Sequence, residues 1–162
     1  MLSIVLTGAA LLSGSKNAAL PEKDIDGTIF LVNRQHVISE QYVPEPLRKT
    51  QVHGMSQSMR EDAATALEEL FQAAQADGIK LSSVSGYRSY SKQSLLYDRK
   101  TKRTGSETEA DKLVARPGAS EHQLGLAMDL ATRNSSTLSE KFGSTPEGQW
   151  VYANCQRFGF IV

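Results

Sequence analysis

A chain of 162 residues is long enough for one domain with a buried core. Its eighteen Lys and Arg balance its eighteen Asp and Glu, so no excess positive charge points to a nucleic-acid partner. The single cysteine, Cys155, excludes an internal disulfide framework and a zinc cluster held by thiolates. We expect Cys155 to be a small buried residue, as free cysteines commonly are.

The first twelve residues are apolar apart from Ser3, Thr7 and Gly8, and small residues follow at positions 13–15. A signal peptidase could cleave at such a site, although no Lys or Arg precedes the apolar run. The run is shorter than the roughly 20 residues that span a bilayer. We interpret residues 1–19 as an export signal or membrane anchor and 20–27 as a linker. The alternative is a buried N-terminal helix or strand.

The next segments combine a short strand, an irregular stretch and a long helix. Residues 28–32 read as a strand, and Pro44 and Pro46 predict little regular structure up to about residue 52. Ser58 and Glu61 form a capping box that opens a helix, and Gly78 ends it. The helix carries one apolar stripe, made of Met59, Ala63, Ala66, Leu67, Leu70, Phe71 and Ala74.

The central part of the chain alternates strands and helices. Residues 79–84 predict a strand that runs into Ser85-Gly86, and a helix follows from Ser91 to about residue 103. A third helix opens at Ser106 and must end before Arg116-Pro117. Residues 125–131 read as a strand that places Asp129 and Ala127 on the face opposite Leu126, Met128 and Leu130.

A last helix is predicted to start at Ser144, with Pro146 at its first position and Glu147 closing a capping box, and to end at Gly159. Residues 160–162 begin another strand. The pattern as a whole predicts an α+β fold, with a small, mainly antiparallel sheet flanked by helices and its last strands missing. We expect a monomer.

Two segments contain residues that could carry chemistry. The first holds His122 and Asp129, a neutral imidazole and a carboxylate of the kind that bind zinc. A histidine and an aspartate at this spacing are often unrelated surface residues. However, an aspartate on a strand of Leu, Ala and Met needs a cation or several hydrogen-bond donors to offset its desolvation. The predicted cleft is therefore lined by the strand that carries Asp129.

The second segment is Ser85-Gly86-Tyr87-Arg88-Ser89, at the end of a strand that leads into a helix. A helix N-terminus favours anions, and an arginine there can hold a carboxylate at two points. A solvated arginine at an ordinary turn is the alternative.

Both segments, together with Gln93, Arg116-Pro117-Gly118 and the pattern Ser120-x-His122-x-x-Gly125-x-Ala127-x-Asp129, resemble the D-alanyl-D-alanine carboxypeptidases of the vancomycin-resistance type. These belong to a wider zinc peptidase superfamily with lysostaphin-like endopeptidases and the hedgehog domain. The resemblance covers residues 28–162. It implies an exported hydrolase, in the periplasm, the cell envelope or outside the cell, whose partner is the peptidoglycan stem peptide and whose cofactor is Zn²⁺.

Carried over to this sequence, the resemblance implies that His122 and Asp129 bind zinc. It also implies that Arg88 contacts the scissile carbonyl or the terminal carboxylate, with Gln93, Ser120 and Tyr87 as further substrate-binding residues. The family's later Glu-x-x-His segment, which supplies the catalytic glutamate and the third ligand, has no counterpart here. We therefore expect a domain that is incomplete at its C-terminus and a chain that is inactive or nearly so.

Other functions stay open at this point. The chain could be a cell-wall peptide-binding module that does not cut its ligand, or a D,D-dipeptidase or endopeptidase of the same superfamily. Specificity for D,D- or L,D-peptides is not decided by these motifs. The histidines His36 and His53 stand in no matching context, and we expect them to be surface or packing residues.

Overall fold

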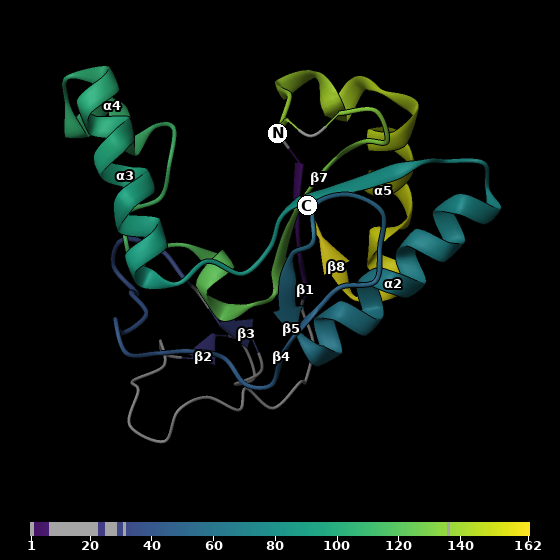
Figure 1. Ribbon diagram of the computed structural model, residues 1–162, viewed down its shortest axis with the longest axis horizontal. Coiled ribbons are helices and arrows are strands. Elements are labelled where there is room, and N and C mark those ends of the chain that lie inside the picture. The colour runs from purple at the N-terminus through teal and green to yellow at the C-terminus, as the bar shows by residue number, and fades with distance from the viewer. Residues whose placement is uncertain (1, 7–22, 25–28, 31, 136) are drawn as a thin grey trace.

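The computed structural model describes residues 2–6, 23–24, 29–30, 32–135 and 137–162. Most of the predicted leader and of the predicted linker lies outside these ranges. The described residues form a four-stranded antiparallel sheet in the order β6-β7-β1-β8, with helices packed around it (Figure 1). The strands are β1 (Leu2–Leu6), β6 (Leu81–Ser85), β7 (Ala127–Thr132) and β8 (Phe160–Ile161). The predicted fold class, α+β with a small antiparallel sheet, is confirmed.

The side chains of strand β7 alternate between the hydrophobic core and the opposite face of the sheet. Met128 and Leu130 are fully buried in the hydrophobic core, on the face predicted from the sequence. Ala127 and Asp129 point the other way along the strand. Asp129 is nevertheless only 2% exposed, because the walls of the cleft described below also surround this face of the strand.

The pairing of β6 with β7 contains one irregularity. Ser83 lies opposite Leu130 and Ser85 lies opposite Asp129, so Val84 is an extra residue in β6. A β-bulge of this kind bends the strand and changes the direction of the side chains beside it. Here it occurs directly opposite the predicted metal ligand.

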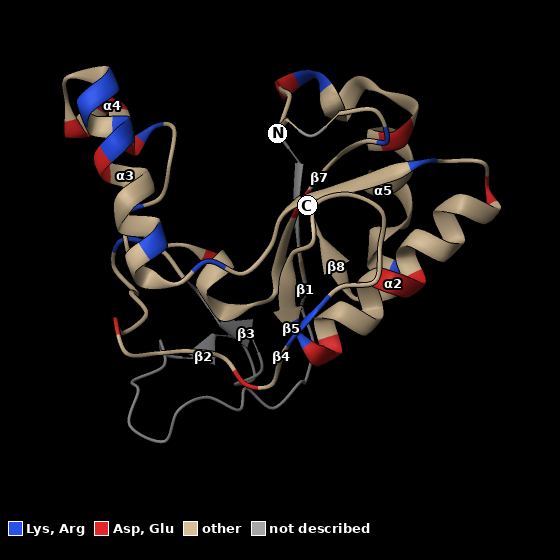
Figure 2. Cartoon of the chain, viewed as in Figure 1, with Lys and Arg blue, Asp and Glu red and all other residues tan. Residues whose placement is uncertain are grey.

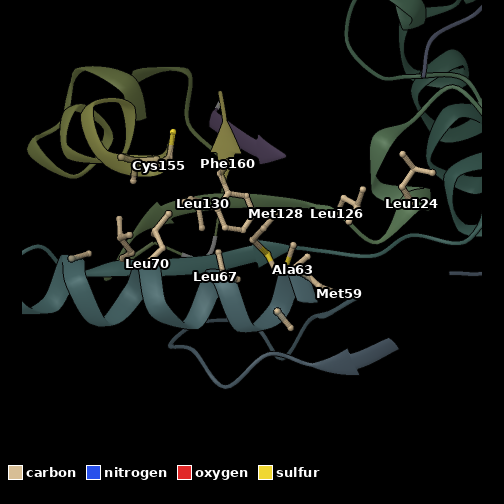
Figure 3. Close-up of a cluster of buried hydrophobic side chains, with 14 of the residues drawn as sticks. Met59, Ala63, Leu67, Leu70, Leu124, Leu126, Met128, Leu130, Cys155 and Phe160 are labelled. Atoms are coloured by element: carbon tan, nitrogen blue, oxygen red, sulfur yellow. The ribbon is translucent and has the colours of Figure 1, made fainter. Parts of the chain in front are cut away.

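Helix α2 (Glu61–Ala76) packs its apolar stripe on the sheet. Figure 3 shows Leu67 and Leu70 of α2 facing Leu130, Met128 and Phe160 of the strands. The side chains of Ala63, Leu67, Leu70 and Ala74 have no solvent exposure, as the helical spacing predicts. Most of the predicted helix is therefore confirmed.

The predicted capping box of α2 is wrong. Ser58 lies in strand β5 (Ser58–Arg60), which pairs with β4 (Leu47–Lys49), and the helix starts three residues later at Glu61. The backbone carbonyl of Ser58 accepts a hydrogen bond from the backbone N–H of Tyr87 at 2.7 Å. This strand pairing also gives the segment after Pro46 a regular structure that the sequence did not predict.

Helices α3 (Tyr90–Thr104) and α4 (Glu107–Asp111) form an arm on one side of β7, whereas α2 and α5 (Pro146–Asn154) lie on the other side (Figure 1). Gly105 ends α3 in the left-handed conformation, as its position predicts. The predicted start of the last helix is wrong by one residue, since Thr145 and not Ser144 caps α5 through a hydrogen bond from the Gly148 N–H.

The N-terminal residues Leu2–Leu6 form strand β1, which lies between β7 and β8. The prediction of an export signal or membrane anchor over residues 1–19 stays a prediction. Strands β2 (Lys23–Asp24) and β3 (Ile29–Phe30) form a separate pair, and β3 falls within the predicted strand at 28–32. No helix in the described ranges has the length and apolar character that crossing a bilayer requires.

Candidate active site

A cleft of about 830 Å³ lies between β7 and the α3–α4 arm. Its walls come from the ends of β6 and β7, from α3, and from the segments 111–116 and 119–122. Five of the six residues predicted to form the site line this cleft, namely Arg88, Gln93, Ser120, His122 and Asp129. A smaller hollow of about 220 Å³ beside Phe71 and His53 contains none of them.

The short helix η1 (Glu121–Leu124) sets the position of His122. Its imidazole Nδ1 lies 2.7 Å from the backbone carbonyl oxygen of Gly86. A carbonyl oxygen only accepts hydrogen bonds, so Nδ1 carries the proton and the lone pair of the neutral ring is on Nε2. A metal-binding histidine usually donates its other ring N–H to a carbonyl or carboxylate oxygen in the same way.

Asp129 extends its carboxylate toward this imidazole. Its Oδ2 lies 3.5 Å from His122 Nε2 and 3.7 Å from Arg88 Nη2. Its Oδ1 is buried and has no hydrogen-bond partner in the described part of the chain. A buried carboxylate oxygen without a partner is costly, and a bound cation would satisfy it. The chemistry of the pair therefore fits a divalent metal such as zinc.

Arg88 joins the two predicted segments. Its backbone N–H donates to the carbonyl of His122 at 3.1 Å, and its Nη1 donates to Gln93 Oε1 at 2.9 Å. Burial lowers the pKa of the guanidinium from its usual value, and the negative charge of Asp129 partly offsets this effect. The group stays protonated at neutral pH, because an arginine pKa starts far above that range. Its Nε is buried and has no hydrogen-bond partner among the described residues.

Gln93 is almost fully buried, and both of its amide atoms bind protein groups. Besides accepting from Arg88, it donates through Nε2 to the carbonyl of Ala115 at 2.7 Å. It thus fixes Arg88 to the loop that forms the far wall of the cleft. The predicted contact of Gln93 with substrate stays a prediction. The same holds for Ser120, which is 6% exposed and whose side chain does not cap η1.

Tyr87 differs from the expectation. Its backbone N–H is bound to Ser58, its side chain is half-buried, and it is not among the residues that line the cleft. Burial raises the pKa of its hydroxyl. The predicted contact of Tyr87 with substrate stays a prediction.

Within the described ranges, no cluster of three or more His, Cys, Asp or Glu side chains is arranged to hold a metal. His36 binds the side chain of Asn33, and His53 lies at the smaller hollow. Neither histidine is among the residues that line the cleft with His122 and Asp129. Glu121 does line the cleft, and the surrounding protein raises the pKa of its carboxyl group, with a smaller opposite effect from His122.

The carbonyl of Gly86 is the functional group that the sequence did not reveal. A side chain at this position would meet the carbonyl oxygen of Ser58 at 2.6 Å and the methyl group of Met128 at 3.1 Å. Only glycine fits between them without a shift of the backbone. The glycine in the Ser-Gly-Tyr-Arg segment could therefore have indicated that the backbone packs closely next to the site.

Known proteins resemble this chain in sequence and in fold. The model of the D-alanyl-D-alanine carboxypeptidase family VanY matches residues 56–162. The putative carboxypeptidase YodJ of Bacillus subtilis (strain 168) is 40% identical over 144 residues, which cover 85% of this chain and 52% of YodJ. The chain spans about half the length of the curated relatives that it matches near 40% identity.

Two solved structures extend the similarity to the fold. The LdcB LD-carboxypeptidase, whose structure was described for peptidoglycan recognition, matches with a TM-score of 0.77 and 39% identity over 87% of this chain and 73% of that chain. A mutant of the vancomycin-resistance D,D-pentapeptidase VanY, in complex with Zn(II), matches with a TM-score of 0.65 and 35% identity over 82% of this chain and 74% of that chain. On the family match and these likenesses, the chain belongs to the VanY family of D-alanyl-D-alanine carboxypeptidases.

Proposed function

We propose that this chain is the substrate-binding and metal-binding part of a zinc-dependent carboxypeptidase that removes a terminal D-alanine from peptidoglycan stem peptides. The observation that carries the proposal is the meeting of His122, Asp129 and Arg88 in one cleft. The Zn(II) complex of VanY and the peptidoglycan recognition described for LdcB support the choice of metal and substrate class.

His122 and Asp129 would hold the zinc. When bound, zinc supplies Lewis-acid polarisation of the scissile carbonyl and makes water more acidic. The carbonyl of Gly86 keeps the His122 lone pair on Nε2, and the guanidinium group of Arg88 at the cleft wall would donate to an oxygen of the substrate. A cationic donor held in place in a cleft stabilises negative charge as it develops on that oxygen.

Carboxypeptidase action requires recognition of a free C-terminal carboxylate. Arg88 suits this role, because Gln93 and Asp129 hold its guanidinium group at the wall of the cleft. Ser120 adds a hydroxyl in the same cleft. We propose that these two side chains select substrates with a free C-terminus. Because peptidoglycan lies outside the cytoplasmic membrane, we also propose that the protein acts in the cell envelope.

A binding experiment tests the substrate assignment. Peptides ending in D-Ala-D-Ala, with the C-terminus either free or amidated, are titrated into the zinc-loaded chain in a calorimeter. We expect the free acid to bind at least about tenfold more tightly, since the amide loses a charge-assisted hydrogen bond. In the Arg88→Ala variant this preference should disappear. Equal affinity of the unmodified chain for both peptides would refute the proposal.

Hydrolysis tests the expectation of weak activity. We expect release of D-alanine by the 162-residue chain to be slow even with added zinc. General acid–base help alone is worth roughly 10²–10⁴-fold, and no glutamate occupies the family's catalytic position in this sequence. Turnover at the rate of an intact family member would show that another group replaces it. Tight binding without cleavage would instead favour the binding-module alternative.

A further inference from the structure

Helix α3 forms one long wall of the cleft. Gln93, Leu96 and Lys100 lie at helical spacing, so they share one face, and all three line the cleft. At about 1.5 Å per residue, Lys100 lies roughly 10 Å along the helix from Gln93. Gln93 holds Arg88 at the reacting end, so Lys100 marks the distal end of the same wall.

The distal end carries several cations, and most of them are already paired. Arg34 and Arg116 both bind Asp111, and Lys112 binds Glu109. Figure 2 shows positive and negative charges interspersed along α3 and α4. The contacts hold the arm together and leave little positive charge for a ligand.

Lys100 differs from these cations. Its side chain is half-buried at the cleft wall, and it makes no ion pair with any carboxylate in the part of the chain that the structure describes. A lysine that lines a cleft and has no carboxylate partner can bind an anion that enters the cleft.

We propose that Lys100 is a specificity-determining residue that binds a carboxylate group of the substrate, about three residues to the amino side of the scissile bond. An extended peptide advances roughly 3.3–3.6 Å per residue, so the distance of about 10 Å corresponds to three residues. Leu96 lies between the two polar ends and supplies an apolar surface for the residue in the middle. The inference rests on the proposed function, since it needs the peptide's C-terminus at Arg88.

Two peptides test the inference, Ala-Glu-Lys-D-Ala-D-Ala and Ala-Gln-Lys-D-Ala-D-Ala. They differ only in the charge of the third residue before the scissile bond. Both are titrated into the zinc-loaded chain and into the Lys100→Met and Lys102→Met variants. Methionine keeps the length and apolar stem of lysine but removes its charge. Lys102 is the matched control, because it belongs to the same helix but is exposed and does not line the cleft.

The unmodified chain should bind the Glu peptide about fivefold more tightly than the Gln peptide, as expected for a partly exposed ion pair. The Lys100→Met variant should bind both equally, and Lys102→Met should keep the preference. High salt should reduce the preference in the unmodified chain. A preference that persists in Lys100→Met, or none in the unmodified chain, would overturn the inference while the proposed function stands. Failure of both peptides to bind the folded chain would refute the proposed function and the inference with it.

Discussion

The imidazole Nε2 of His122 lies 3.5 Å from the carboxylate Oδ2 of Asp129. The two residues come from different elements, the short helix η1 and strand β7, with Gly125 in the left-handed conformation between them. A side chain at Gly125 would also meet the backbone nitrogen of Arg60 at 3.1 Å. The close approach of the two ligands therefore depends on a tight glycine turn packed against the start of α2.

Replacing either ligand should abolish most zinc binding. We expect His122→Ala and Asp129→Ala each to weaken zinc affinity by at least about 10–100-fold, the loss typical of removing even an outer partner of a metal site. A competition titration with a chromophoric chelator measures this affinity. His53→Ala is the control, because His53 lies at the other hollow and should bind as the unmodified chain does. Unchanged affinity in both ligand variants would disprove the site.

A methyl group at position 86 should disturb the site through the backbone. In Gly86→Ala the new Cβ would lie 2.6 Å from the Ser58 carbonyl oxygen, so the turn must shift and carry the Gly86 carbonyl away from His122. We expect a loss of about 1–3 kcal/mol in the free energy of unfolding, as for other overpacked sites, together with weaker zinc binding.

The control for this variant is Gly143→Ala. No heavy atom lies within 4 Å of a Cβ built there, so urea unfolding and zinc titration should both match the unmodified chain. If Gly86→Ala behaves like this control, the histidine does not depend on the glycine carbonyl.

Arg88 and Gln93 should act as a unit in peptide binding. Gln93→Ala removes the group that holds Arg88 Nη1 and leaves the carbonyl of Ala115 without its donor. We expect Gln93→Ala to cost about 1–3 kcal/mol of peptide-binding free energy in the unmodified background and almost nothing when Arg88 is already Ala. Calorimetric affinities of the four proteins give the coupling. Additive losses would instead indicate that Gln93 contacts the peptide independently of Arg88.

Asp111 should make the α3–α4 arm sensitive to acid. Hydrogen bonds from Arg116 lower the pKa of its carboxyl group to about 2, with a further hydrogen bond from Tyr97. Because the folded pKa is below the unfolded one, the contribution to stability is present above about pH 4 and is lost as the pH falls toward 2.

The matched variant is Asp111→Asn, which keeps the size of the side chain but removes its charge. It should melt at a lower temperature than the unmodified chain at pH 6, and the two melting temperatures should converge as the pH approaches 2. Thermal melts followed by circular dichroism between pH 6 and pH 2.5 measure the difference. A constant difference over this range would show that the ion pairs of Asp111 do not stabilise the arm.

The sequence predicted the elements that have a strong apolar period. The stripe of α2 and the alternation around Met128 and Leu130 identified the two faces of the core, since burial determines both. The start of α2 was predicted wrongly, because Ser58 pairs with Lys49 in a strand instead of capping the helix. Long-range pairing of this kind leaves no local signal.

The candidate site was also only partly predictable. Residue chemistry and the family resemblance identified His122, Asp129 and Arg88, and the structure brings them together. The extra residue Val84 in β6 and the role of Gly86 could not be predicted, since both arise where separate segments meet. The helical spacing of Lys100 from Gln93 predicts that the two share one face of a helix. Only the folded structure shows that this face lines the cleft.

The position of β1 has a consequence for the order in which the molecule assembles. Val5 pairs with both Ala127 and Ile161, so the middle of the sheet joins residues from nearly opposite ends of the chain. Contacts this distant in sequence slow folding, because a long loop must close before the pairing is formed. During synthesis the first strand would leave the ribosome long before its neighbours exist. The helical arm, which is built from local contacts, can form early, and the sheet that carries Asp129 is completed last.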